Sequence, residues 1–214
     1  MSKKIHTIQS SDKSDFDKEV NQFLELGCEL MDGGYEVINS DDGVVYSQVI
    51  VFKNCEVEFY ENGQLKFVEN KNEDGKRDGL STHWYEIGQK SIERTFKDGK
   101  RDGLWTSWYE NGQKQLEGTY KNGKEDGLFI TWYENGERRS EGTWKGGKFD
   151  GLWISWFENG QKRLEGTYKY GDLVNLIGRW NVDGSVRTEP FDWEGIYWIN
   201  ILILSTRWFP QSSE

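Results

Sequence analysis

The sequence predicts a mainly β fold, in which tandem 24-residue hairpin repeats form an elongated, antiparallel, single-layer meander behind a small N-terminal α+β cap. The first observation behind this prediction is a block that recurs every 24 residues, at 103–112, 127–136 and 151–160. The second is the glycine usage, because 25 glycines stand against two prolines and recur at fixed places in that block, as turn residues do. The third is an aromatic content of 15%, which is too high for a disordered chain. A fixed period means that one small unit is stacked many times.

Residues 1–55 read as a separate β-α-β-β head. An alternating stretch over 4–9 predicts a strand, and 35–38 and 44–52 predict two more. Between them, apolar residues recur at spacings of three and four and predict a helix that Ser14 caps and Gly33-Gly34 ends. These residues are Phe16, Val20, Phe23, Leu24, Gly27, Leu30 and Met31. The head is therefore expected to lay one helix on a small sheet.

Residues 56–188 form the repeat array, and each repeat reads as two strands, such as 104–109 and 114–120, joined by Glu110-Asn111-Gly112. A two-residue Asn-Gly turn would pair Trp105 with Gly118, whereas a three-residue loop with Gly112 in the left-handed region would pair Leu104 with Gly118. We favour the three-residue loop, because it separates apolar from polar residues more cleanly. It also pairs Thr106 with Leu116. On that register one face carries Leu104, Trp108, Leu116 and Tyr120, and a slip of one residue would exchange the faces.

Aromatic residues then fall into columns that run along the array. One column holds Trp84, Trp108, Trp132, Trp156 and Trp180, and a second holds Phe96, Tyr120, Trp144 and Tyr168. Gly118, Gly142 and Gly166 are expected to leave room for these rings. The other face would carry a further stripe, which is either covered core or an exposed recognition surface with aromatic anchors among polar groups. Its members are the candidate partner-binding residues Trp105, Tyr109, Phe129, Tyr133, Trp153 and Phe157.

Residues 189–214 are expected to cap the far end of the array, since open sheet edges invite aggregation. The apolar run 196–204 is too short to span a membrane, and the N-terminus lacks the apolar core of a signal peptide. Cys28 and Cys55 show no metal-binding spacing; a disulfide between them is one alternative, and two free thiols are the interpretation that we favour. These features favour a cytoplasmic protein.

The net charge of −10 excludes the basic stripe that nucleic acids or anionic membranes require. Residues 1–55 hold five Lys against ten Asp or Glu, a net of −5, so the head is the acidic part. The two histidines, His6 and His83, lie in unrelated segments, and the glutamates of the repeats are copied rather than unique. We therefore expect no catalytic residues, no bound metal and no cofactor.

The repeat resembles the MORN family in its bacterial variant form. The residues that carry the resemblance are Leu116-x-Gly118-x-Tyr120-x-x-Gly123-x-x-x-Gly127 and, in phase, Gly142-x-Trp144-x-x-Gly147 and Gly166-x-Tyr168-x-x-Gly171. Asp78, Asp102, Asp126 and Asp150 stand where the usual repeat often has His. The head is similar to a small bacterial β-α-β-β domain of unknown function. It shares with that domain the stretch Val20 to Gly27, the Gly33-Gly34 pair and Tyr46-Ser47-Gln48.

The MORN resemblance implies a non-catalytic protein-binding module, because bacterial proteins with such repeats include antitoxins that block a partner toxin. The acidic head would suit a basic toxin through charge complementarity. A structural scaffold that associates with itself is the alternative. Membrane or lipid association, which is often proposed for MORN proteins, is disfavoured by the charge.

Overall fold

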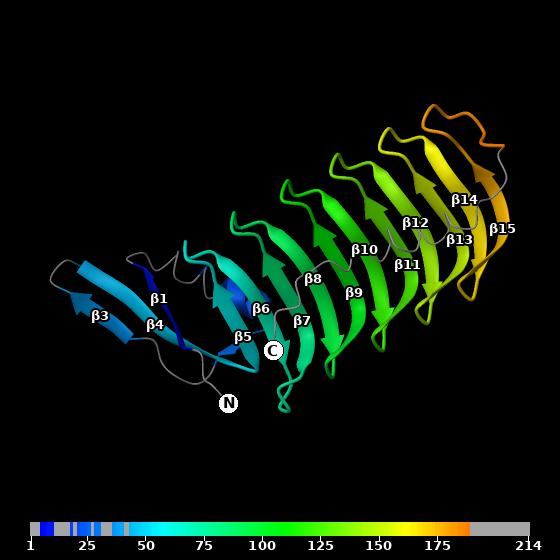
Figure 1. The fold of residues 1–214 in the computed structure, drawn as a ribbon. Coiled ribbons are helices and arrows are strands. Elements are labelled where there is room, and N and C mark those ends of the chain that lie inside the picture. The colour runs from blue at the N-terminus through cyan, green and yellow to red at the C-terminus, as the bar shows by residue number, and fades with distance from the viewer. Residues whose placement is uncertain are drawn as a thin grey trace.

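The computed structural model describes residues 5–10, 18, 21–26, 28–30, 36–40 and 43–188. Most of the described chain forms one open sheet in which 11 antiparallel strands follow one another in sequence order from β5 to β15 (Figure 1). The predicted meander of tandem hairpins is therefore confirmed. Its strands are β5 Cys55–Phe59, β6 Leu65–Lys71, β7 Arg77–Trp84, β8 Lys90–Lys97, β9 Lys100–Trp108, β10 Lys114–Lys121, β11 Lys124–Trp132, β12 Arg138–Lys145, β13 Lys148–Trp156, β14 Lys162–Lys169 and β15 Asp172–Arg179.

The head contains a second, smaller sheet at the N-terminal end of the array. In it β4 (Gly43–Lys53) pairs with β1 (Ile5–Ser10), β2 (Glu29–Leu30) and β3 (Glu36–Ser40). Helix is present at residue 18 and at residues 21–25, and Leu30 belongs to β2, so the prediction that the helix includes Leu30 was wrong. The amide of Cys28 donates to the carbonyl of Phe23 at 3.1 Å, and Glu29 and Leu30 then pair with Lys53 and Phe52. The predicted cap at Ser14, the Gly33-Gly34 pair and the C-terminal cap 189–214 lie outside the described residues.

The hairpin loops confirm the predicted loop length but not the predicted pairing. The amide of Tyr109 donates to Gln113 O, the amide of Gly112 donates to Tyr109 O, and Gly112 has a φ of 82°. A bulge between Lys114 and Leu116 then adds one residue to β10. Trp105 consequently pairs with Gly118, and Leu104 pairs with Thr119.

Side chains alternate between the two faces along a strand. The extra residue in β10 therefore changes which residues of β9 share a face with Leu116, Gly118 and Tyr120. Trp105 and Ser107 share a face with Leu116, Gly118 and Tyr120, which we call the aromatic face. The opposite face carries Leu104, Thr106, Trp108, Glu117 and Thr119. The prediction that Leu104 and Trp108 share a face with Tyr120 was therefore wrong.

Successive repeats are joined by hydrogen bonds at both ends of the strands. At the three-residue loops, the hydroxyls of Tyr85, Tyr109 and Tyr133 donate to the carbonyls of Trp108, Trp132 and Trp156. At the other end, two-residue turns such as Asn122-Gly123 have positive φ at both positions, 52° and 83°. The amide of Asn122 donates to Asp102 Oδ2 of the previous repeat, as that of Asp98 does to Asp78. The Asp at the position where the usual repeat often has His therefore accepts a hydrogen bond from the next two-residue turn.

The head helix packs on the opposite face of the first hairpin. Phe23, Leu26 and Cys28 form one buried cluster with Val57, Val68 and Trp84, and Leu65 packs against it. The Sγ atoms of the free thiols Cys28 and Cys55 are 2.7 Å apart, so this contact also joins the head to β5.

Beyond the head, the opposite face carries ion pairs at the positions of Leu65 and Val68. These pairs are Lys90–Glu93, Lys114–Glu117, Arg138–Glu141 and Lys162–Glu165. Leu104, Leu128 and Leu152 are about half exposed on the same face. The chain therefore uses apolar residues where its helix covers the sheet and ion pairs where the sheet meets water.

Candidate interaction surface

The middle row of the aromatic face alternates rings with glycines across the strands. The order of paired residues is Trp105, Gly118, Phe129, Gly142 and Trp153. A Cβ atom at Gly118 would overlap the Phe129 ring, and one at Gly142 would overlap the Trp153 ring. The rings also pack on the neighbouring column, with centroids 5.1 Å apart for Trp105–Tyr120 and 5.8 Å apart for Phe129–Trp144. Each glycine thus makes room for a ring of the next repeat.

We call this row of alternating rings and glycines the ladder. Three of the six predicted partner-binding residues are part of it. Phe129 and Trp153 are only 6% and 4% exposed, and Trp105 is half-buried below the Arg101 guanidinium, whose central carbon lies 4.4 Å from its ring centroid. All three lie on the same face as Tyr120 and Leu116, so their predicted position on the other face was wrong. Packing within the sheet therefore accounts for these three rings as core residues. A partner-binding role for them stays a prediction.

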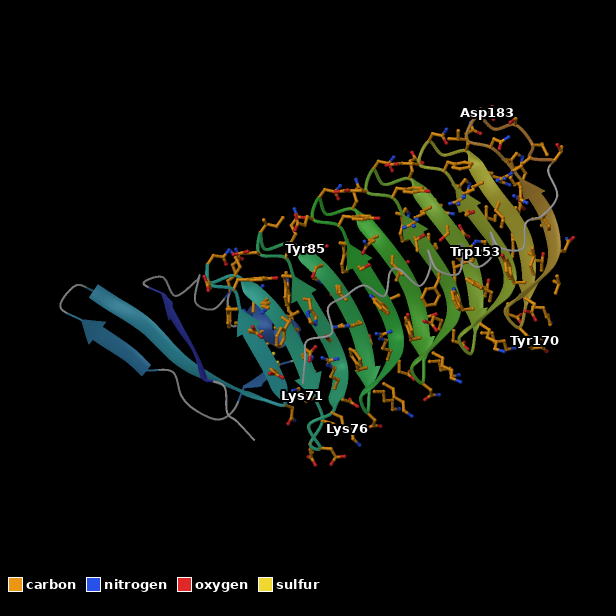
Figure 2. All side chains as sticks on the ribbon, viewed as in Figure 1. Lys71, Lys76, Tyr85, Trp153, Tyr170 and Asp183 are labelled. Carbon is orange, nitrogen blue, oxygen red and sulfur yellow. The ribbon has the colours of Figure 1, made fainter. Side chains whose placement is uncertain are left out.

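The other three predicted residues begin the three-residue loops. Tyr109 and Tyr133 donate their hydroxyls to the next repeat, and Phe157 occupies the same position without a hydroxyl. In Figure 2, Tyr85 marks this loop end of the sheet, whereas Trp153 lies on the strands. The structure therefore divides the six residues between a buried ladder and a row of loop contacts and does not gather them into one patch.

The middle row of the aromatic face changes character toward the N-terminal end of the array. Continuing from Trp105, its paired residues are Arg94, Ser81 and Glu69. Arg94 and Glu69 hold the glycine positions of the later repeats, and Ser81 holds a ring position. Large charged residues thus stand at the glycine positions and a small residue stands at a ring position, so that the two large residues Arg94 and Trp105 pair directly where the two patterns meet.

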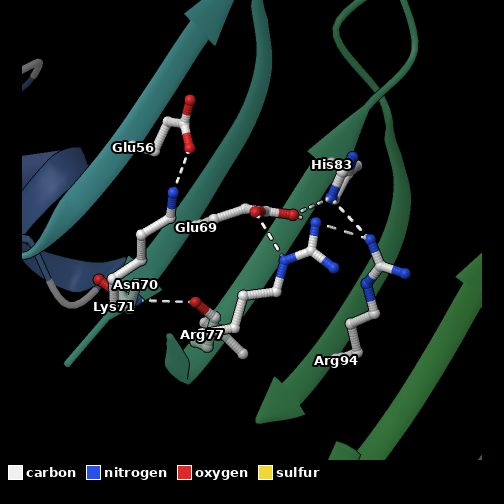
Figure 3. Close-up of polar contacts among 8 residues, drawn as sticks. Glu56, Glu69, Asn70, Lys71, Arg77, His83 and Arg94 are labelled. Atoms are coloured by element: carbon white, nitrogen blue, oxygen red, sulfur yellow. Dashed lines mark hydrogen bonds and ion pairs between the residues drawn. The ribbon is translucent and has the colours of Figure 1, made fainter. Parts of the chain in front are cut away.

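Glu69 is the buried centre of this polar cluster, shown in Figure 3. Its Oε2 atom accepts from Arg77 Nε at 2.8 Å, and its Oε1 atom lies 3.3 Å from His83 Nε2. Burial alone would raise the pKa of this carboxyl, but the contacts with His83 and Arg77 outweigh it and lower the pKa to about 2. Glu69 is therefore ionised at neutral pH.

Two guanidinium groups, those of Arg77 and Arg94, lie within 4.0 Å of this single carboxylate. Arg94 Nη2 lies 2.9 Å from His83 Nε2 and 4.0 Å from Glu69 Oε1. Burial, with repulsion from Arg77 and Arg101, lowers the pKa of Arg94 to about 10. Three buried polar atoms of this row have no hydrogen-bond partner among the described residues, namely Ser81 Oγ, Arg94 Nε and Trp105 Nε1.

Sequence reasoning missed the polar cluster, although a signal for it exists. The signal is the departure of Glu69, Ser81 and Arg94 from the residues found at the same repeat positions, which becomes visible once the register is known. Among the described residues, no three His, Cys, Asp or Glu side chains are grouped so that they could hold a metal ion. Within the same part of the chain, no helix is long and apolar enough to cross a membrane.

Comparison with known families identifies the repeats. The family model described as MORN repeat variant matches residues 55–70, 101–122, 125–145 and 149–170. The chain is a MORN-repeat protein. No curated protein matches it.

The four matches leave one hairpin of the MORN array out. Residues 71–100 contain β7 and β8, which pair in the register of the matched hairpins, with Gly79 opposite Phe96 as Gly103 is opposite Tyr120. This hairpin therefore keeps the backbone of a MORN repeat while Ser81, His83 and Arg94 change its surface. The unmatched hairpin thus contributes Arg77, Ser81, His83 and Arg94 to the polar cluster, and Glu69 comes from the neighbouring matched strand β6.

Proposed function

We propose that this MORN-repeat protein is a non-catalytic module that binds a protein partner through its aromatic face. The observation that carries the proposal is the contrast between repeats on that face. Positions that hold the ladder together recur, whereas the position of Arg77 and Arg101 is taken by Glu125, Phe149 and Leu173 in the following repeats. A repeat array offers a long rigid surface, and residues that differ from repeat to repeat give that surface its specificity.

An antitoxin or immunity protein is the specific form of this function that we propose, with a toxin as the blocked partner. The resemblance to MORN-variant antitoxins and the net charge of −10 support it, because an acidic protein complements a basic target. A cytoplasmic location would be consistent with that role.

Affinity purification of the tagged full-length chain from its native cells tests the proposal. We expect one partner in a fixed stoichiometry, and the two purified proteins should re-form the complex when mixed. If the partner is a toxin, its expression alone should arrest growth and co-expression of this chain should restore it. Recovery of the chain alone as a monomer would contradict a binding function.

A self-assembling scaffold is the second candidate, and the end of the array favours it. Among the described strands, β15 pairs only with β14, and its other side is bonded only near its end, where Trp180 bridges to Val186 and the amide of Arg187 donates to Arg179 O. Within the described part of the chain, the rest of that edge offers its backbone groups to a further strand. Light scattering that shows concentration-dependent growth of the purified chain, with no other protein bound, would favour the scaffold over the binding module.

A further inference from the structure

The arginine cluster of the aromatic face has more positive charge than its surroundings balance. On strands β6 to β11 this face carries Lys71, Arg77, Arg94 and Arg101 against Glu69 and Glu125. Glu56 on β5 pairs with Lys71 at 2.5 Å, and Arg77 pairs with Glu69. Counting only these Lys, Arg and Glu side chains, four cations and three carboxylates leave one positive charge in excess. This excess is notable in a chain whose net charge is −10.

The unpaired charge belongs to the Arg94 and Arg101 side of the cluster. The Arg101 guanidinium lies over two rings, with its central carbon 4.4 Å from the Trp105 centroid and 5.3 Å from that of Tyr120. Arg94 Nε and Trp105 Nε1, on residues that pair across β8 and β9, are buried donors without an acceptor among the described residues. Buried donors without an acceptor are costly, so an acceptor placed here would be bound favourably.

Carboxylate is the anion that this geometry already accommodates. Glu69 shows that a carboxylate fits between a guanidinium and His83 in the cluster. One repeat further on, Glu125 Oε1 accepts from the hydroxyl of Tyr120 at 3.2 Å. Guanidinium groups bind carboxylates through two parallel hydrogen bonds, which adds geometric specificity to the charge.

We propose that Arg77, Arg94 and Arg101, with the indole N–H of Trp105, form an anchor site for one acidic side chain of the protein partner. This inference rests on the proposed binding function and names the chemistry that the partner presents. The partly buried Arg101 lies over the Trp105 ring, and its displacement by the incoming carboxylate opens the indole edge. The carboxylate then neutralises the excess charge and accepts from the free donors.

Titration of the full-length protein with the peptide acetyl-Glu-Glu-Glu-Glu-amide tests the anchor. The indole N–H resonance of Trp105, assigned with Trp105→Phe, should shift in a saturable way. Acetyl-Gln-Gln-Gln-Gln-amide at the same ionic strength should leave it unchanged. Arg101→Gln should weaken the glutamate peptide at least tenfold and should fold normally, since other repeats place Glu, Phe or Leu at this position. Arg138→Gln, which removes an exposed arginine from the opposite face, should bind like the wild type.

Several outcomes would overturn the anchor. They are the absence of a saturable shift, an equal shift with the glutamine peptide, and an affinity that Arg101→Gln leaves unchanged. Saturation by inorganic phosphate but not by the glutamate peptide would assign the site to a free oxyanion and would also overturn it. The binding function is judged separately. A purified partner that binds wild type and Arg101→Gln equally well would uphold the function while removing the anchor.

Discussion

At the residue scale, glycine decides where a ring can lie in this sheet. Antiparallel strands are about 4.8 Å apart, so a ring that lies flat on the sheet covers its neighbour in the pairing row. Gly118 and Gly142 are those neighbours for Phe129 and Trp153. Gly166 differs, because a Cβ atom there would first meet Leu173 at 2.7 Å rather than a ring. The expectation that these glycines make room for rings is therefore met at two of the three positions.

Substitution of Gly142 by Val should destabilise the array by about 1–3 kcal/mol, because the side chain would displace the Trp153 ring from its contact with Phe149. Gly146→Asn is the matched control. Its Cβ atom would meet nothing within 4 Å, and Asn122 already holds the same turn position with positive φ. Urea unfolding should show a lower midpoint for Gly142→Val alone. Equal midpoints for the wild type and both variants would show that packing of the Trp153 ring over Gly142 does not stabilise the array.

Glu69 should make the stability of the protein depend on acid pH. Its pKa in the folded chain, about 2, is below the ordinary value of 4.5. The carboxylate therefore stabilises the fold above about pH 4.5, and this contribution is lost as the pH falls toward 2. Glu69→Gln should lower the unfolding free energy at pH 7 by roughly 2 kcal/mol, and the difference from the wild type should shrink near pH 2. Urea unfolding at both pH values measures this, with the turn variant Glu158→Gln as control. A deficit of the same size at pH 2 would show that lost packing, not charge, is the cause.

At the element scale, the two faces of the sheet follow different rules. The aromatic face is its own core, because rings from one repeat pack on rings of the next. The opposite face depends on what covers it, and Leu65 and Val68 replace the Lys–Glu pair of the later hairpins where the head helix lies. The same hairpin backbone therefore occurs both under the head helix and facing water. The residues at the positions of Leu65 and Val68 are apolar in the first case and an ion pair in the second.

Substitution of both Leu65 and Val68 by charged residues should detach the head helix from the sheet. Leu65→Lys with Val68→Glu recreates the ion pair of an uncovered hairpin and places two charges under Phe23 and Leu26. We expect the strands to persist, while the Cys28 thiol, 3% exposed in the folded chain, becomes reactive toward a maleimide reagent. Peptide mass spectrometry measures that labelling. Leu128→Ser, which alters an uncovered leucine on the same face, should leave Cys28 protected. Protection of Cys28 in the double variant would show that other contacts hold the head.

At the scale of the whole molecule, the array is assembled from contacts between neighbouring strands. Each described strand from β6 to β14 pairs with the strand before it and the strand after it, and side chains such as Tyr109, Asn111 and Asp102 form hydrogen bonds to the adjoining repeat. Stability in such an array is close to a sum of unit and interface contributions. Length is thus adjustable in units of 24 residues.

Removal of one whole repeat should leave a folded protein. Deletion of residues 125–148 joins Lys124 to Phe149 and places Trp153 opposite Gly118, which preserves the alternation of rings and glycines. Solution scattering should show a maximum dimension shorter by about 10 Å, the width of two strands. Deletion of residues 125–136, half a repeat, breaks the alternation and should give insoluble protein. A soluble, cooperatively folded half-repeat deletion would show that the phase of the array is not required.

The sequence by itself determined the meander, the hairpin unit and its loop. A 24-residue period and glycines at fixed positions are local signals, and they depend on no distant contact. Only the tertiary structure decided which face each ring occupies, because one bulge at Lys114–Leu116 shifts the register by a residue and no turn residue marks it. The helix likewise ended early, since pairing of Glu29 and Leu30 with β4 outweighed the helical spacing. The polar cluster also depends on the tertiary structure. Glu69, Ser81 and Arg94 come from three strands, and pairing of those strands in one register is what brings the three residues into one row.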